Sequence, residues 1–372
     1  MAIYSHGLQR LLVMLGLLAC ISMAWAQSAP SATPTRPLAK RPLPPPHWIA
    51  ARKINARLHA SDLGLVINTA DPYSVAVGEY YIKKRGIPLD QVLRVELPVK
   101  THLSVPEFGA LYAQVRDFMG PQVQALALAW SQPYAVGCNA ITSALTLGYE
   151  PEACRKTCEP TRLSPYFNSP TAQPFTDLGL RPSMLLASRS VESAMALIDR
   201  GVASDQQLGK RGVPIANAVF VRTNDVARNV RAPLFPPEGP MGNTGAQVDV
   251  RAVDNAGMVP RVFIYQTGQT RVSHPERVQW LPGALADHLT SFGGNLLATT
   301  GQMSAVEWLE AGATASYGTV SEPCNHLQKF PHPQILLLNY VQGATAIEAY
   351  WRSVAWPAQG VFVGEPLAAP FE

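Results

Sequence analysis

The segment from residue 322 to residue 332 brings a carboxylate, a thiol and two imidazoles into one stretch of the chain. Glu322 and Cys324 are followed by His326 and, six residues later, by His332. In an extended backbone, Cys324 and His326 share one face because they are two residues apart. They fit a histidine-activated cysteine nucleophile or a Cys/His/His metal site. The favoured alternative is a disulfide at Cys324 beside two surface histidines, as expected in an oxidising compartment.

The cysteines after residue 26 are Cys138, Cys154, Cys158 and Cys324. Their even number favours two disulfides, for which three pairings are possible. A local Cys154–Cys158 bond would leave Cys138 for Cys324. A metal site formed by Cys154, Cys158 and a nearby histidine is less favoured, because the usual two-residue spacer between the cysteines is absent. We therefore predict disulfides, with no metal and no other cofactor.

The Asp287–His288 pair is a second candidate for chemistry. We predict a helix over residues 282–290, so that the imidazole reaches over the glycine turn at 291–294 as a general base oriented by a carboxylate. The favoured alternative is a histidine near the C-terminal end of a helix, where a positive charge is stabilised. Together with Cys324 and His326, His288 completes the set of candidate catalytic residues.

Asn68 and Asp71 follow the first predicted strand, residues 63–67. Open α/β sheets bind ligands at the carboxyl ends of their strands, so both residues are candidates for a binding groove. Both are also common in turns and helix caps, which is their more frequent role. The turn at 71–74 lacks a glycine-rich phosphate-binding fingerprint, and no nucleotide cofactor is expected.

Short apolar runs alternate with helical patterns from residue 62 onward. This alternation predicts an α/β fold, a layered and mostly parallel sheet with helices on both faces. Strands are expected at 63–67, 92–97, 125–130, 184–187, 216–221, 262–265, 295–298, 315–320 and 360–363. Helices are expected at 73–84, 104–119, 191–199, 282–290, 304–311, 335–341 and 345–352. Glycine- and proline-rich stretches near 131–180 and 223–256 are predicted to be loop insertions in a single domain, 49–372.

Residues 1–26 have the features of a secretory signal peptide. An apolar run from Leu11 to Ala24 ends at small residues suited to cleavage after Ala26. An uncleaved anchor and a lipoprotein modified at Cys20 are the alternatives. The proline-rich residues 27–48 are expected to form a disordered linker.

The remaining chain has no apolar run long enough to span a membrane. A formal net charge of +4 is too small to imply a nucleic acid partner. We therefore expect a periplasmic or secreted protein.

The C-terminal part of the chain carries longer distinctive strings. Residues 280–284 (WLPGA), 287–294 (DHLTSFGG), 312–320 (GATASYGTV) and the tail 363–368 (VGEPLA) resemble a family of uncharacterised exported bacterial proteins, whose tail is similar to GDPLxxPF. The resemblance extends from about residue 63 to residue 371. It implies export and an α/β fold, and it implies no activity.

A more distant resemblance is to the gingipain-type cysteine peptidases of the caspase-like fold. Those enzymes place a histidine after one strand and a cysteine after the next, since the thiol needs an imidazole to become a thiolate. The corresponding turns here are 265–269 and 298–302, with Gln269 at the histidine position and Thr300 or Gly301 at the cysteine position. Gln269 cannot act as a base. The resemblance therefore implies a caspase-like fold without the peptidase pair. We predict a layered sheet that is caspase-like or flavodoxin-like.

Two hypotheses for the function follow, and the sequence leaves open whether the chain is an enzyme. The favoured one is a non-catalytic envelope protein that binds a peptide or a glycan in a groove formed by Asn68, Asp71, Gln269, Thr300 and Glu322. The alternative is a cell-envelope hydrolase, similar to cysteine peptidases, that uses Cys324 and nearby histidines.

Overall fold

The structure, a computed structural model, describes residues 47–253 and 259–371. The predicted signal peptide, and the predicted linker up to residue 46, lie outside these residues. All described residues fall within one compact unit, Pro44–Glu372. In the described part of the chain, no helix has both the length and the apolar character needed to cross a membrane.

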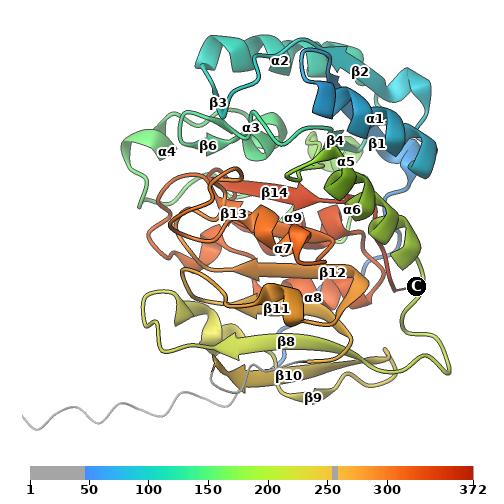
Figure 1. Cartoon of the computed structure of the whole chain (residues 1–372), viewed down its shortest axis with the longest axis vertical. Coiled ribbons are helices and arrows are strands. Elements are labelled where there is room, and N and C mark those ends of the chain that lie inside the picture. The colour runs from blue at the N-terminus through green and yellow to red at the C-terminus, as the bar shows by residue number, and fades with distance from the viewer. Residues whose placement is uncertain (1–46, 254–258, 372) are drawn as a thin grey trace, which may run out of the picture. The chain divides into compact units, whose positions relative to one another are not determined.

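Eleven strands of the described residues form one sheet in the order β2-β1-β4-β7-β14-β13-β12-β11-β8-β10-β9 (Figure 1). The strands are β1 (Leu63–Asn68), β2 (Val92–Val95), β4 (Ala125–Leu128), β7 (Ser183–Leu185), β8 (Ala216–Arg222), β9 (Gly239–Pro240), β10 (Ala246–Ala252), β11 (Val262–Thr267), β12 (Trp280–His288), β13 (Ala315–Thr319) and β14 (Gly360–Gly364). Neighbouring strands in this sheet are parallel except β13 with β14 and β10 with β9. The predicted mostly parallel α/β sheet is therefore confirmed.

The antiparallel contact between β13 and β14 divides the sheet into two halves that run in opposite directions. Strands β2, β1, β4, β7 and β14 are parallel to one another, and so are β13, β12, β11, β8 and β10. In Figure 1, the arrow of β14 accordingly points against those of β12 and β8. The carboxyl ends of the two halves therefore lie at opposite edges of the sheet.

Helices cover both faces of the sheet. The helices are α1 (Pro72–Arg85), α2 (Val105–Phe118), α3 (Ile141–Leu147), α4 (Glu152–Arg155), α5 (Pro174–Leu178), α6 (Val191–Ser204), α7 (Ala305–Glu310), α8 (Pro333–Val341) and α9 (Ala346–Ser353). Short 3-10 turns occur at Ala60–Asp62, Leu89–Gln91, Asn229–Leu234, Pro275–Arg277 and Leu327–Lys329. Side chains of α1, α8 and α9 share one apolar cluster, and those of α2, α3 and α7 share another. Alternate strand residues enter the two clusters, as the pleat of a strand requires: Leu65 lies in the first and Val66 in the second.

The helix ends are set by local sequence. The Asp71 side chain accepts a hydrogen bond from the Tyr73 amide at 3.0 Å, and Gly86, with a φ of 66°, ends the same helix in the left-handed region. In α2, Ser104 and Glu107 form the predicted capping box. Both helices thus begin where their capping residues predict.

The segment that contains His288 is a strand, and the predicted helix over 282–290 is wrong. Its alanines and leucines suit a helix, but β12 pairs on both sides, with β11 and with β13. Buried between two parallel neighbours, its backbone amides and carbonyls bond to those strands, and this pairing overrides local helix propensity. Gly283, with a φ of 85°, lies where an added Cβ would meet Ser204 at 2.8 Å. The predicted strand at 295–298 is also wrong, because this segment forms turns after β12.

Within residues 223–256, β10 pairs with the whole length of β8 and extends the sheet. Within residues 131–180, short strands β5 (Ala135–Val136) and β6 (Asn139–Ala140) join β3 (His102–Leu103) in a second small sheet. The rest of that stretch contains short helices. It also contains Cys154 and Cys158, which both form disulfides.

The C-terminal tail is held by a buried carboxylate. Glu365 accepts hydrogen bonds from the Tyr81 hydroxyl at 2.6 Å and from Arg85 Nε at 3.0 Å, and both partners belong to α1. The Glu365 side chain is fully buried, where an unpaired charge would be costly. The guanidinium of Arg85 compensates this charge. The tail at 363–368 therefore has a structural role at the junction of α1 and the sheet.

Candidate functional site

The carboxyl ends of β8, β12 and β13 meet at one edge of the sheet because these strands are parallel. The loops that follow them enclose a cavity of about 260 Å³, which we call the edge cavity. It is lined by Ala227, Arg228, Leu289, Thr290, Ser291, Glu322, Pro323, Cys324, Asn325 and Phe330. Of the predicted site residues, the structure brings Glu322 and Cys324 together here.

Hydrogen bonds fix the floor of the edge cavity. The Thr290 hydroxyl accepts from Arg228 Nε at 3.3 Å and donates to Gln302 Oε1 at 2.6 Å. Arg228 is also paired with Asp225 at 2.9 Å. Gly268, which follows β11, packs so tightly beneath that an added Cβ would overlap the Arg228 carbonyl oxygen. A hydroxyl and a guanidinium are thus held in place where the strands end.

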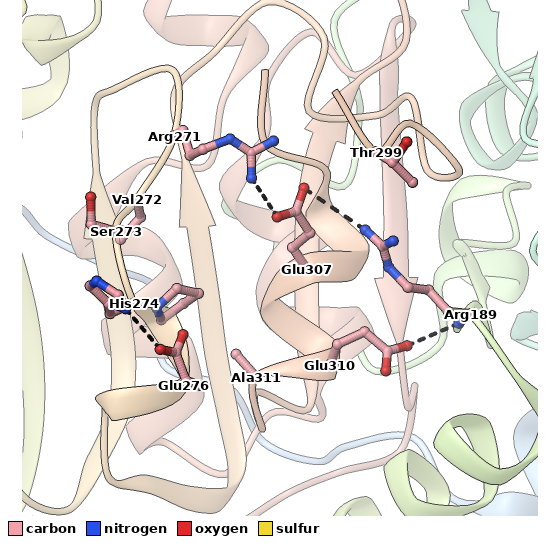
Figure 2. Close-up of a pocket in the computed structure, with 11 residues that line it drawn as sticks. Arg189, Arg271, Val272, Ser273, His274, Glu276, Thr299, Glu307, Glu310 and Ala311 are labelled. Atoms are coloured by element: carbon pink, nitrogen blue, oxygen red, sulfur yellow. Dashed lines mark hydrogen bonds and ion pairs between the residues drawn. The ribbon is translucent and has the colours of Figure 1, made fainter. Parts of the chain in front are cut away.

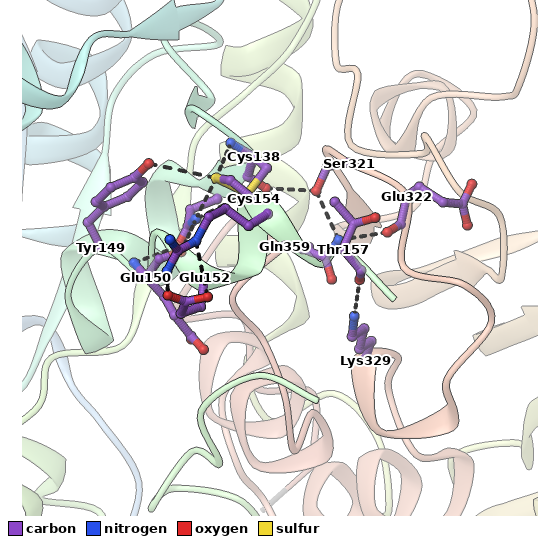
Figure 3. Close-up of a disulfide and its surroundings, with 12 residues drawn as sticks. Cys138, Tyr149, Glu150, Glu152, Cys154, Thr157, Ser321, Glu322, Lys329 and Gln359 are labelled. Carbon is purple, nitrogen blue, oxygen red and sulfur yellow. Dashed lines mark hydrogen bonds and ion pairs between the residues drawn. A yellow bond between two sulfur atoms is a disulfide. The ribbon is translucent and has the colours of Figure 1, made fainter. Parts of the chain in front are cut away.

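The opposite wall is the 321–325 loop, which is tied to the 138–158 segment (Figure 3). The Ser321 hydroxyl donates to the Cys138 carbonyl at 2.8 Å, and Lys329 Nζ donates to the Thr157 carbonyl. Figure 3 shows the Glu322 side chain directed away from Lys329 and from the disulfide. The Glu322 carboxylate accepts the Cys324 amide at 2.8 Å.

The disulfides are Cys138–Cys154 and Cys158–Cys324. The prediction of disulfides is confirmed, but the local bond that we considered does not form. Cys154 lies on α4 against the turn of Cys138, whose amide donates to its sulfur at 3.2 Å, while Cys158 lies beyond the end of that helix. Cys324 therefore lines the edge cavity as half of a disulfide and carries no thiol. Cys324 and Asn325 both have a left-handed backbone, with φ of 58° and 49°, a conformation that non-glycine residues adopt at a cost in free energy.

His288 is the last residue of β12, directly before Leu289 and Thr290 of the lining, and it is 1% exposed. Trp308 Nε1 donates to its Nδ1 at 2.9 Å, and its Nε2 lies 3.1 Å from the Met303 carbonyl. Since the indole nitrogen can only donate, Nδ1 accepts and the proton is on Nε2. Burial lowers the pKa of His288 to about 3, so the ring is neutral. Both nitrogens are occupied by protein groups.

The carboxylate beside His288 faces a buried arginine. Asp287 Oδ1 accepts from Arg231 Nη1 at 2.6 Å, and Gln266 donates to the second oxygen at 2.7 Å. Burial raises the pKa of Asp287, and the attraction of Arg231 opposes that rise. Asp287 therefore neutralises a guanidinium in the core rather than orienting His288.

The third predicted catalytic residue, His326, does not line the edge cavity. Its ring lies 6.0 Å from that of Trp356, and its carbonyl accepts the Lys329 amide at 3.0 Å. His332 caps α8, where its ring accepts the Ile335 amide at 3.4 Å. His288, Cys324 and His326 thus do not form one constellation.

Gln269 and Thr300 lie on loops that touch, but neither residue lines the edge cavity. The Met303 amide donates to the Thr270 carbonyl at 2.8 Å, which joins the two loops. The strand beside β11 is β12, which ends at His288, and not the strand predicted at 295–298. The turn that follows β12 begins at Leu289. Thr290, rather than Thr300, is therefore the threonine next to the end of β12.

Asn68 and Asp71 lie apart from the other groove candidates. They follow β1, which belongs to the half of the sheet that runs in the opposite direction. The Asn68 side chain donates to the Leu97 carbonyl at 3.0 Å and accepts the Leu97 amide at 2.8 Å, and Asp71 caps α1. Asn68 thus stabilises the turn after β1 and Asp71 caps a helix, which were the alternatives to a role in a binding groove. Both residues lie at the opposite edge of the sheet from the edge cavity.

Arg228, Thr290 and Ser291 line the edge cavity but were not among the residues predicted from the sequence. Residues 289–294 contain a threonine, a serine and two glycines directly after an apolar run, a pattern typical of a turn at the end of a strand. The prediction of a helix over 282–290 prevented this interpretation. Arg228 carried no such signal, because its position depends on packing against Gly268.

A second and larger cavity, of about 710 Å³, lies between α7 and the connection from β11 to β12 (Figure 2). Within the described ranges, no cluster of three or more His, Cys, Asp or Glu side chains is arranged to hold a metal ion.

Several solved structures are similar to the chain. The Arg-specific cysteine proteinase gingipain R is 11% identical, and the match covers 83% of this chain and 78% of that one with a TM-score of 0.46. A structure described as a protease is 9% identical over 84% of this chain and 78% of its own, with a TM-score of 0.45. A complex of gingipain pro- and mature domains from Porphyromonas gingivalis is 11% identical over 82% and 79%, with a TM-score of 0.41. No protein-family model and no curated protein matches the chain.

Proposed function

We propose that the protein is an exported binding protein that holds a peptide in the edge cavity and does not cleave it. The observation that carries this proposal is the Cys158–Cys324 disulfide, which places a bonded sulfur in the cavity wall. A cysteine peptidase needs a thiolate with a neighbouring imidazole. The cavity wall supplies a carboxylate, hydroxyls and a guanidinium instead.

The position of His288 supports binding without catalysis. A general base needs a free nitrogen within hydrogen-bond reach of the substrate and a pKa near the working pH. Both nitrogens of His288 are hydrogen-bonded within the protein, and its pKa of about 3 is far below neutral. The ring therefore takes no proton from a ligand.

The lining of the edge cavity and the residues beside it suit a peptide side chain. Two apolar side chains lie beside lining residues, Val226 at 86% exposed and Phe292 at 37% exposed. A polar pocket with apolar neighbours suits one peptide side chain inserted between Ser291 and Glu322.

Export is the second part of the proposal. The apolar run and small residues of 1–26 support a signal peptide. Two disulfides among the described residues are consistent with an oxidising compartment. Expression in a Gram-negative host, followed by fractionation and N-terminal sequencing, tests this part. A mature N-terminus at Gln27 in the periplasmic fraction is expected, and an intact N-terminus in the cytoplasm would contradict export.

Affinity selection from random hexapeptide pools tests the binding function. The peptides are capped at both ends, incubated with the protein, separated by size exclusion and identified by mass spectrometry. We expect a subset of peptides to be retained without cleavage. Ser291→Trp, which fills the edge cavity, should reduce retention about tenfold. Thr300→Trp, on an exposed turn outside the cavity, is the matched control and should bind normally.

Cleaved peptides in the eluate would contradict the non-catalytic assignment. Equal retention by wild type and Ser291→Trp would contradict the location of the site. If the pools gave no retained peptide and an oligosaccharide array did, the ligand would be a glycan and the peptide assignment would be wrong.

A further inference from the structure

The cavity beside α7 is lined by side chains of both charges. Figure 2 shows Arg271, Glu307 and Arg189 forming a chain of contacts along α7, with Glu310 below, while Glu276 lies on the connection from β11 to β12. Two arginines thus share the lining with three glutamates. The volume of about 710 Å³ is in the range of small-molecule sites.

The two guanidinium groups share one carboxylate. Arg271 Nη1 lies 2.6 Å from Glu307 Oε2, and Arg189 Nη2 lies 3.9 Å from Glu307 Oε1. Glu307 Oε1 also accepts the Ser304 amide at 3.1 Å as part of a capping box. The guanidinium of Arg189 therefore has no acceptor within hydrogen-bond distance among the described residues. The side chains of Arg189 and Arg271 are 39% and 42% exposed, so a ligand can reach both.

The carboxylates of the lining differ in how many of their oxygens already accept hydrogen bonds from the protein. Glu310 is satisfied, because its oxygens accept the Arg189 amide and the Ser193 hydroxyl, both at 2.9 Å. On the other side of the cavity, Glu276 contacts His274 at 3.0 Å through one oxygen, and its side chain is 60% exposed. Of these two, Glu276 is the carboxylate available to a ligand.

This arrangement disfavours a ligand with a single charge. An anion would gain from the arginines but would face three glutamates, and a cation would have to approach the two arginines. A ligand with separated charges of both signs meets neither penalty. A guanidinium with a free planar fork is suited to a carboxylate, which it can bind through two parallel hydrogen bonds.

We propose that this cavity binds a zwitterionic ligand, a short peptide with free termini, whose carboxylate lies between Arg189 and Arg271 and whose ammonium group faces Glu276. The site is separate from the edge cavity and does not depend on the function proposed for it. The capped peptides used to test the edge cavity lack both charged ends, so failure of one proposal leaves the other unaffected.

Ligand-observed NMR titration of the purified protein with three probes tests the proposal. The probes are Ala-Ala, its N-acetyl form without the ammonium group, and its amide without the carboxylate. We expect Ala-Ala to bind about fivefold to tenfold more tightly than either blocked form. Arg189→Gln should abolish the discrimination against the amide, and Glu276→Gln should abolish the discrimination against the acetyl form.

Matched controls are Arg277→Gln, an exposed arginine of the same connection outside the lining, and Glu96→Gln, an exposed glutamate beyond β2. Both should keep the discrimination of the wild type. Equal affinity for the three probes, or no binding of Ala-Ala, would overturn the proposal. Discrimination that survives in both lining variants would place the site elsewhere and overturn it equally.

Discussion

Replacement of His288 by glutamine should change how the stability of the protein depends on pH. The folded state keeps the imidazole neutral, because burial lowers its pKa from 6.5 to about 3 and Trp308 occupies Nδ1. In the unfolded chain, the same ring takes up a proton below about pH 6.5. The unfolded state therefore binds more protons between these two values, and the stability that His288 contributes falls as the pH decreases.

The size of the effect follows from linkage. With pKa values of 6.5 unfolded and about 3 folded, His288 lowers the free energy of unfolding by about 2 kcal/mol between pH 6.5 and pH 4.5. His332, whose pKa burial lowers to about 4, acts in the same direction and must be separated from it. Glutamine does not titrate and offers both an acceptor for Trp308 and a donor for the Met303 carbonyl. The difference between wild type and His288→Gln therefore isolates the contribution of this ring.

Urea denaturation followed by circular dichroism, at pH 7, 6.5, 5.5 and 4.5, measures the effect. We expect the stability of the wild type relative to His288→Gln to fall by about 2 kcal/mol from pH 6.5 to pH 4.5. Parallel pH profiles for the two proteins would refute the reasoning, because they would mean that His288 titrates alike in both states. A ring of that kind would reach solvent and be free to act as a base.

Three further predictions concern the contacts that build the edge cavity and its surroundings. Replacing both cysteines of Cys158–Cys324 by serine should lower the free energy of unfolding by about 5 kcal/mol in the chain-entropy model, because this disulfide closes a loop of 166 residues. The same change at Cys138–Cys154, which closes a loop of 16 residues, should lower it by about 3 kcal/mol. Equal losses in urea denaturation would contradict this order. Gly268→Ala should cost about 2 kcal/mol or more because its Cβ would overlap a backbone carbonyl oxygen, whereas Gly109→Ala, in α2 with open space around it, should be neutral or stabilising by up to about 1 kcal/mol. Thermal denaturation checks this pair, and similar shifts for both would be evidence against it. Asp287→Asn should cost about 3 to 5 kcal/mol because its buried arginine partner keeps its charge, and a loss under about 1 kcal/mol in urea would contradict that.

Many elements could be predicted because the relevant signals are local. The cap at Asp71, the glycine at Gly86 and the capping box at Ser104 set the ends of α1 and α2 through contacts within a few residues. Apolar runs such as 216–221 likewise predicted buried strands. The even number of cysteines predicted disulfides, since that expectation needs only a count and a compartment.

The candidate site was harder to predict because it depends on neighbours distant in the sequence. The assignment of 282–290 as a helix followed local propensity, and it moved the expected turn from Leu289 to the region of Thr300. In the structure, strands from residues 262 and 315 onward flank this segment and supply its backbone partners. A disulfide at Cys324 was expected from the cysteine count, but its partner could not be predicted because Cys158 is 166 residues away.

The alternation of strands and helices, the capped ends of the first two helices and the presence of disulfides follow from the amino-acid sequence alone. Each depends on residues near one another in the chain or on composition. Three features depend instead on the three-dimensional fold: β12 is a strand, the sheet reverses direction between β13 and β14, and Arg228, Thr290 and Glu322 face one cavity. A buried backbone must form its hydrogen bonds with whichever segments the fold places beside it. Strand order and direction, and with them the set of side chains at each edge, are therefore properties of long-range pairing.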